Sequence, residues 1–233
     1  MIAFVIQIAI EVAAAILAIT LHEAAHGYAA LALGDDTAKL AGRLSLNPLR
    51  HVDRTGTIIL PGLLLIGQLL TLGRVEFMFG WAKPVPVGAW KFRDPRRGMA
   101  LVAVAGPAMN FFLAWLGALA AYALPHLPGV MAGPATGFLQ AFILYNLVLG
   151  LFNLIPVPPL DGGRIVVGLL PLPLARVWAG IERQGILLVL LVVFILPLVL
   201  RQFGVLFDPV QAGLMHVLPW AEKLVLRLAG HHV

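Results

Sequence analysis

Long apolar runs separated by shorter polar segments dominate the sequence. A membrane-spanning helix needs about 20 mainly apolar residues, and three runs reach that length, at about 3–33, 99–124 and 135–156. A fourth, shorter run at 185–200 is expected to form a further span. The pattern therefore predicts an all-α polytopic membrane protein with a core of three transmembrane helices.

Another apolar run, 57–73, is short and has Pro61-Gly62 near its start. We expect residues 57–88 to form a re-entrant hairpin or β-loop instead of a span. Non-helical backbone at membrane depth is tolerated only where protein buries it or where it lines a cavity, so such a segment would suit the side of an active site. Residues 210–228 near the end of the chain are amphipathic, which favours a helix lying at the membrane interface.

The composition agrees with a membrane-embedded chain. Of the 233 residues, 61% are hydrophobic and 12% are charged, whereas soluble domains carry about 25% charged residues. The net charge of +5 does not indicate nucleic-acid binding, because the basic residues gather in loops between apolar runs. The absence of cysteine excludes a disulfide framework, a thiol nucleophile and a cysteine-based metal site.

These features predict a multi-pass protein of the cell membrane, surrounded by the lipid bilayer and without a nucleic-acid partner. Residues 1–19 lack a basic start and a cleavage site, so we expect them to be a retained span and not a signal peptide. The sequence leaves the oligomeric state open.

The candidate chemistry lies in the first apolar run, where His22-Glu23-Ala24-Ala25-His26 has the spacing H-E-x-x-H. In a helix, His22 and His26 lie one turn apart on one face, and their imidazoles can share one tetrahedral Zn²⁺. Glu23 is then free to take a proton from the attacking water and pass it to the leaving amine.

The alternative is a pair of buried histidines with Glu23 as an ionic partner. An ionised group at the centre of a membrane costs about 2.5–3.5 kcal/mol. Three ionisable groups within five residues therefore need a compensating reason, and metal binding supplies one.

A catalytic zinc site needs a third protein ligand. Asp161 is the best candidate, because it follows a predicted span and precedes Gly162-Gly163, which would let the backbone turn sharply and approach another helix closely. The alternative for Asp161 is a turn residue at a helix end.

The distribution of basic residues indicates the topology. Residues 34–98 contain ten Lys and Arg residues, whereas 125–134 contain none. Because cytoplasmic loops are rich in Lys and Arg, the first core span should run from outside to inside. The third should do the same, provided that 57–73 does not cross the membrane. His22, His26 and Asp161 would then lie at one depth, nearer the cytoplasmic side.

Three motifs together resemble the site-2 protease family of intramembrane zinc metalloproteases. They are H-E-x-x-H in the first span, Ala105-Gly106-Pro107 with Asn110 in a middle span, and Asn153-x-x-Pro156-x-Pro158-x-Leu160-Asp161-Gly162-Gly163. The resemblance covers roughly residues 18–165. In addition, residues 80–87 are similar to the membrane-associated β-loop that family members place between their first two core helices.

The resemblance implies roles for the candidate residues. His22, His26 and Asp161 would hold one Zn²⁺ per chain, and Glu23 would be the catalytic base. Asn153 would polarise the scissile carbonyl or hold the substrate strand, with an interhelical hydrogen bond as the alternative. For Asn110, close helix packing is the favoured interpretation.

Only about nine residues join the second and third core spans, too few for a PDZ domain, and no nucleotide-sensing domain follows. The chain therefore resembles the compact branch of the family. We expect a single membrane-embedded metalloprotease domain over 1–233, with a core at 1–165 and accessory C-terminal helices at 166–233.

The implied function is hydrolysis of peptide bonds within or near transmembrane segments of membrane proteins, known as regulated intramembrane proteolysis. Two alternatives stay open at this point. One is a non-proteolytic membrane metal-binding protein, and the other is a metal-dependent hydrolase of a non-peptide substrate.

Overall fold

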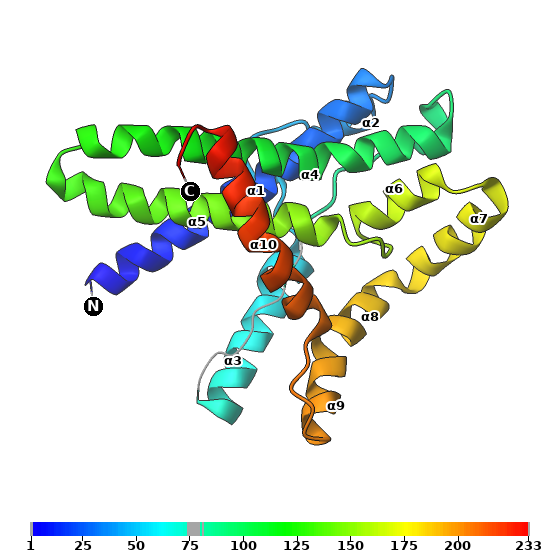
Figure 1. The fold of residues 1–233 in the computed structure, drawn as a ribbon. Helices are drawn as coiled ribbons and strands as arrows, with labels where there is room; N and C mark the ends of the chain where they lie inside the picture. Colours follow the sequence, from blue (N-terminus) through cyan, green and yellow to red (C-terminus); the bar gives the residue numbers. More distant parts are fainter. Residues whose placement is uncertain (1, 74–79, 81, 233) are drawn as a thin grey trace.

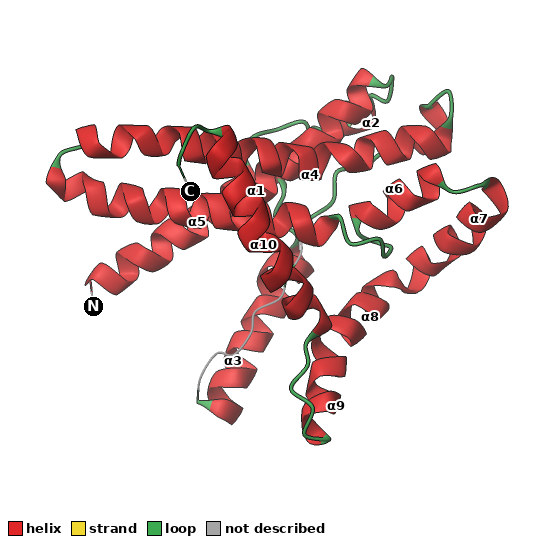
Figure 2. Ribbon diagram, viewed as in Figure 1, coloured by secondary structure: helices red, strands yellow, loops and turns green. Residues whose placement is uncertain are grey.

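The computed structural model describes residues 2–73, 80 and 82–232. Figure 2 shows helices joined by loops, and the described residues contain no strand. Three long helices form the core: α1 (Ile2–Ala32), α4 (Pro95–Ala120) and α5 (Gly129–Asn153). They pack against one another, and α4 and α5 run side by side in Figure 1. A 3₁₀ segment, Ala121–His126, joins these two helices.

Four helical stretches among the described residues are long and apolar enough to cross a membrane, judged by length and composition. They are Val5–Ala32, Arg54–Thr71, Pro95–His126 and Gly129–Asn153. The prediction of an all-α polytopic membrane protein is therefore confirmed. The three predicted core spans correspond to α1, α4 and α5, with ends that differ by a few residues.

The ends of α4 and α5 have local causes. Asp94 caps α4, since its side chain accepts hydrogen bonds from the backbone amides of Arg96 and Arg97. This cap starts the helix before the apolar run begins. α5 stops at Asn153, ahead of Pro156, whose ring and missing N–H cannot continue a helix.

The segment expected to form a hairpin differs from that prediction. A π-helical turn, Arg54–Ile59, leads directly into α3 (Leu60–Leu72), so that the apolar run forms one helical arm. Pro61 stands in the first turn of α3, where a missing N–H costs little, and it therefore starts a helix instead of breaking one. Figure 1 shows α3 pointing away from the bundle of α1, α4 and α5.

The return arm of the expected hairpin falls partly on 74–79 and 81, which lie outside the described residues. Residues 82–88 are described and have neither helical nor strand structure. An extended segment forms a regular strand only when a neighbouring strand pairs with it, and the described part of the chain offers this loop none. The expected β-loop is therefore present as an extended loop.

Short helices follow the core: α6 (Asp161–Leu169), α7 (Leu172–Ile181), α8 (Gly185–Leu190) and α9 (Leu196–Gln202), with a π-helical turn, Leu191–Ile195, between α8 and α9. The predicted further span at 185–200 thus forms a helical run, of which Leu187–Gln202 is apolar but shorter than the four candidate spans. A small helix, α2 (Thr37–Leu40), follows α1.

The last helix, α10 (Pro209–Leu228), packs on the bundle. Ala221 and Val225 join a buried apolar cluster with Ala118 of α4 and Leu147 of α5. Trp115 also donates a hydrogen bond to the carbonyl of Leu228 at 3.3 Å. Part of the apolar surface of α10 therefore packs on protein, while large apolar side chains such as Met215 and Trp220 stay exposed. In Figure 1 α10 crosses over α4 and α5.

Candidate metal centre

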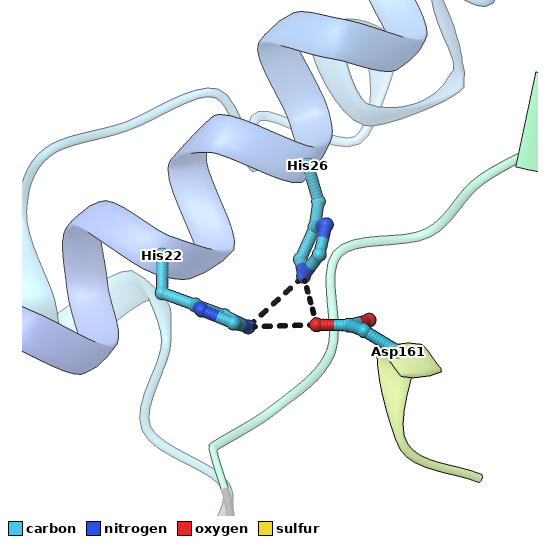
Figure 3. Close-up of side chains that lie close together, drawn as sticks. All are labelled: His22, His26 and Asp161. Carbon is cyan, nitrogen blue, oxygen red and sulfur yellow. Dashed lines mark hydrogen bonds and ion pairs between the residues drawn. The ribbon is translucent and has the colours of Figure 1, made fainter. Parts of the chain in front are cut away.

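His22, His26 and Asp161 meet at one point in the structure. Figure 3 shows the two imidazoles on successive turns of α1, pointing at the carboxylate at the start of α6. The two Nε2 atoms are 3.0 Å apart. Asp161 Oδ2 lies 3.2 Å from Nε2 of His22 and 3.3 Å from Nε2 of His26. The three side chains are 6%, 12% and 8% exposed, so the cluster is shielded from solvent.

These distances fit a tetrahedral zinc site. Ligands about 2.0–2.1 Å from Zn²⁺ at tetrahedral angles lie roughly 3.3 Å from one another, which agrees with the three separations. Two histidines and one carboxylate also leave the fourth position of a catalytic site open for water or substrate. The donor set and its spacing therefore suit zinc.

The outer nitrogen of each imidazole supports the same conclusion. Nδ1 of His22 donates to Oδ1 of Asn110 at 2.6 Å, and Nδ1 of His26 donates to the carbonyl of Val102 at 2.8 Å. Because carbonyl oxygens only accept hydrogen bonds, each neutral ring carries its proton on Nδ1 and presents the lone pair of Nε2 inward. Asp161 Oδ2 is buried beside these lone pairs without a hydrogen-bond partner. A cation bound between them would hold these three atoms together.

Asn110 belongs to a longer buried chain of amides. Its Nδ2 donates to Oδ1 of Asn146 at 2.8 Å, and Nδ2 of Asn146 donates to the carbonyl of Phe142 at 2.8 Å. Both asparagines are 0% exposed. The interpretation of Asn110 as a packing residue therefore missed its contact with His22. Asn146 belongs to no motif, and only the packing of α5 on α4 brings it to Asn110.

Gly106 lets α4 pass directly over the two imidazoles. A Cβ at this position would lie 2.5 Å from Cε1 of His22 and 2.5 Å from Nε2 of His26, closer than real Cβ contacts. The Gly-Pro pair in the middle span therefore provides the space in which the site is built, in addition to close helix packing.

Asp161 reaches the histidines because α5 ends at Asn153 and the chain turns back before α6. The two glycines after Asp161 permit this turn. A side chain at Gly162 would collide with the carbonyl oxygens of Leu154 and Ile155, and one at Gly163 would collide with the backbone of Pro158.

All five predicted site residues line one cavity of about 460 Å³. They are His22, Glu23, His26, Asn153 and Asp161. The side-chain amide of Asn153 donates to the carbonyl of Leu149 at 3.0 Å, which fixes its orientation at the cavity wall. Most of the other lining residues are apolar.

Glu23 is held by the extended loop 82–88. Its Oε2 accepts a hydrogen bond from the backbone amide of Val85 at 3.1 Å. The loop is anchored a second time where Asp35 Oδ2 accepts from the amide of Gly88 at 2.6 Å. Burial alone would raise the pKa of Asp35, but hydrogen bonds from Thr37 and Gly88 and the nearby Lys91 ammonium lower it.

Comparison with known proteins identifies the family. Residues 128–197 match the profile of Peptidase family M50. "Putative zinc metalloprotease YwhC" of Bacillus subtilis is 39% identical over 214 residues, covering 83% of this chain and 90% of that protein. The chain belongs to peptidase family M50.

Two mycobacterial relatives extend the comparison. "Putative zinc metalloprotease Rip2" of Mycolicibacterium smegmatis is 31% identical over 194 residues, covering 81% of this chain and 67% of that protein. The protein of the same name from Mycobacterium tuberculosis is 33% identical over 219 residues, covering 91% of this chain and 77% of that protein. No solved structure gives a significant match.

Membership in M50 confirms the predictions of a site-2 type zinc metalloprotease and of zinc as its cofactor. The matched profile includes Asn153 and Asp161 but begins after the H-E-x-x-H segment. The individual roles of the site residues stay predictions, which the geometry described above supports.

Proposed function

We propose that this M50 protease hydrolyses peptide bonds within or near transmembrane segments of membrane proteins. In this proposal His22, His26 and Asp161 bind one zinc ion per chain, Glu23 is the catalytic base, and Asn153 contacts the scissile peptide. The observation that carries it is the triangle of three ligand atoms 3.0–3.3 Å apart, which opens into the same cavity as Glu23 and Asn153.

Zinc bound there would act as a Lewis acid that activates water and polarises the scissile carbonyl. Glu23 would take the proton of the attacking water and return it to the leaving nitrogen. The Val85 amide keeps the Glu23 carboxylate turned into the cavity. The side chain of Asn153 would stabilise the charge that develops on the carbonyl oxygen.

The hydrogen bonding of a helix supports an extended substrate. A helix keeps its carbonyl groups in internal hydrogen bonds, so that they are not free for attack. We therefore propose that the cleaved segment unwinds and pairs as an added strand with the loop 82–88.

The position of the site along α4 supports access from the cytoplasm. Gly106, beside the imidazoles, is 11 residues after Pro95 and 20 residues before His126. At 1.5 Å per residue, these intervals are about 17 Å and about 30 Å. The nearer end carries Arg96 and Arg97, which the positive-inside rule places in the cytoplasm. We propose that the protein lies in the cell membrane with its active site nearer the cytoplasmic side.

We also propose that 1–233 acts as one domain. The five site residues lie within 1–165, the expected core, while 166–233 is accessory, with α10 packed on α4 and α5.

The test is cleavage of single-span membrane proteins by the purified protein in lipid vesicles, with the products sequenced by mass spectrometry. We expect cuts within or just beside the spanning segment. The proposal would be contradicted if the protein cut only soluble regions, or if it cleaved none of a broad set of substrates.

A further inference from the structure

Arg164 lies at the edge of the catalytic cavity and has no role in the chemistry described so far. It stands three residues after Asp161 on α6, which places both side chains on neighbouring positions of one helix face. It lines the same cavity as the metal-binding triad and Glu23. Among the described residues that line this cavity, Arg164 is the only Lys or Arg.

The present partner of Arg164 holds it weakly. Glu182, just before α8, accepts hydrogen bonds from Nη2 of Arg164 at 2.8 Å and from Nε at 3.2 Å, both to the same oxygen, Oε1. The two side chains are 39% and 43% exposed, and ion pairs at such exposure contribute little stability. Glu182 itself does not line the cavity. The ion pair therefore places the guanidinium at the edge of the cavity but binds it only weakly.

A guanidinium carries five N–H donors, and this ion pair uses two of them. The ligand that best matches the planar arrangement of these donors is a carboxylate, which can accept two parallel hydrogen bonds. Most of the cavity wall is apolar, Glu23 would repel an incoming carboxylate, and the proposed zinc ion is taken up by the attacking water and the scissile carbonyl. An acidic side chain of a bound substrate would thus find its favourable charge partner at Arg164.

We propose that Arg164 is a specificity residue that binds the carboxylate of an Asp or Glu close to the scissile bond of the substrate. Glu182 occupies the guanidinium in the resting enzyme and is displaced when the substrate binds. The inference rests on the proposed proteolytic function and adds a preference for acidic residues at one position of the cleaved segment.

The test uses a single-span substrate that the full-length protein cleaves, with Glu or Gln placed in turn at each of about six positions around the cut. The measured quantity is the ratio of kcat/KM for the Glu and Gln members at each position. For the wild-type protein we expect a ratio of roughly tenfold or more at one position, the effect of one charge-assisted hydrogen-bonded pair.

Three variants decide the cause of that ratio. Arg164→Met should bring the ratio close to one, and Arg164→Lys, which keeps the charge but loses the planar donors, should give an intermediate ratio. Glu182→Gln should raise the ratio, because it removes the competing carboxylate. Arg97→Met is the matched control, since Arg97 is an exposed arginine paired with Asp94 and does not line the cavity.

If Arg164 serves only to anchor α8 through Glu182, Arg164→Met and Glu182→Gln will lower cleavage of the Glu and Gln members equally. That result overturns the inference, as does a wild-type protein that cleaves every member at the same rate. A wild-type protein that cleaves no member overturns the proposed function itself, and this inference with it.

Discussion

Asn110 on α4 accepts a hydrogen bond from Nδ1 of His22 on α1 at 2.6 Å, in a part of the protein where both side chains are buried. The contact joins two motifs that lie 88 residues apart. It fixes the proton of His22 on Nδ1 and leaves Nε2 free to bind a metal. The amide of Asn146 in turn fixes the orientation of Asn110.

Replacing Asn110 should weaken zinc binding. Partners of a ligating histidine typically contribute about 10–100-fold to metal affinity, so we expect a loss of that size for Asn110→Ala. Asn110→Asp keeps an acceptor for Nδ1 of His22 and should lose less. Competition with a chromogenic chelator measures the affinity. An unchanged dissociation constant in Asn110→Ala would show that Asn110 only packs the helices.

Asn146 should act on the metal through Asn110. Asn146→Leu removes the acceptor at 2.8 Å for Nδ2 of Asn110 and leaves this donor only the carbonyl of Ala18 at 3.4 Å. The loss of one such hydrogen bond costs about 0.5–1.5 kcal/mol. We expect a smaller loss of zinc affinity than in Asn110→Ala. In the double variant the two losses of zinc affinity should not add, because Asn146 acts on His22 only through its hydrogen bond with Asn110. Additive losses would mean that the two asparagines act independently.

Gly106→Ala should abolish both zinc binding and cleavage. The added methyl group would lie 2.5 Å from His22 and His26, so the imidazoles would have to move out of the ligand triangle. Gly133→Ala in α5 is the matched control, because nothing lies within 4 Å of its Cβ position. The control should bind zinc as the wild type does. Zinc content after gel filtration separates the two outcomes, and a Gly106→Ala protein with full zinc would refute the predicted clash.

Asp35→Asn should destabilise the protein by about 1–3 kcal/mol through loss of buried hydrogen bonds to a charged group. Because the pKa of Asp35 is lowered in the folded state, the ionised carboxylate stabilises the fold above about pH 4, and this contribution is lost as the pH falls further. The difference in melting temperature between wild type and variant, both stripped of zinc, should be constant from about pH 8 to 5 and shrink below 4.

Asp36→Asn is the control for this series. Asp36 contacts the same Lys91 at 2.5 Å but is exposed, so its replacement should change the melting temperature little at any pH. Equal effects of the two substitutions would show that the anchor of loop 82–88 is not the source of the stabilisation.

The sequence predicted the parts of the site that depend on local spacing. His22, Glu23 and His26 are fixed by one helical turn, and Asp161 follows from the need for a third ligand beside a flexible Gly-Gly pair. These four side chains do share one cavity. Asn146 could not be found in this way, because its contact arises only when α5 packs on α4.

In the fold as well, most features set by local sequence were predicted, whereas features that depend on helix packing were not. Apolar length predicted α1, α4 and α5, since a bilayer sets the number of residues needed to cross it. The helix at Arg54–Leu72 was missed because the run 57–73 is short and has Pro61-Gly62 near its start, although proline in a first turn is compatible with a helix. For α10, an amphipathic pattern alone could not decide whether its apolar side faces lipid headgroups or protein.

The central claim is that one zinc ion held by His22, His26 and Asp161 works together with Glu23 to cut a peptide bond. The most direct test measures zinc content and substrate cleavage in parallel for wild type and Glu23→Gln. We predict about one zinc per chain in both proteins, with cleavage in the wild type and none above background in the variant. A wild type that binds no zinc, or a variant that cleaves as fast as the wild type, would contradict the account.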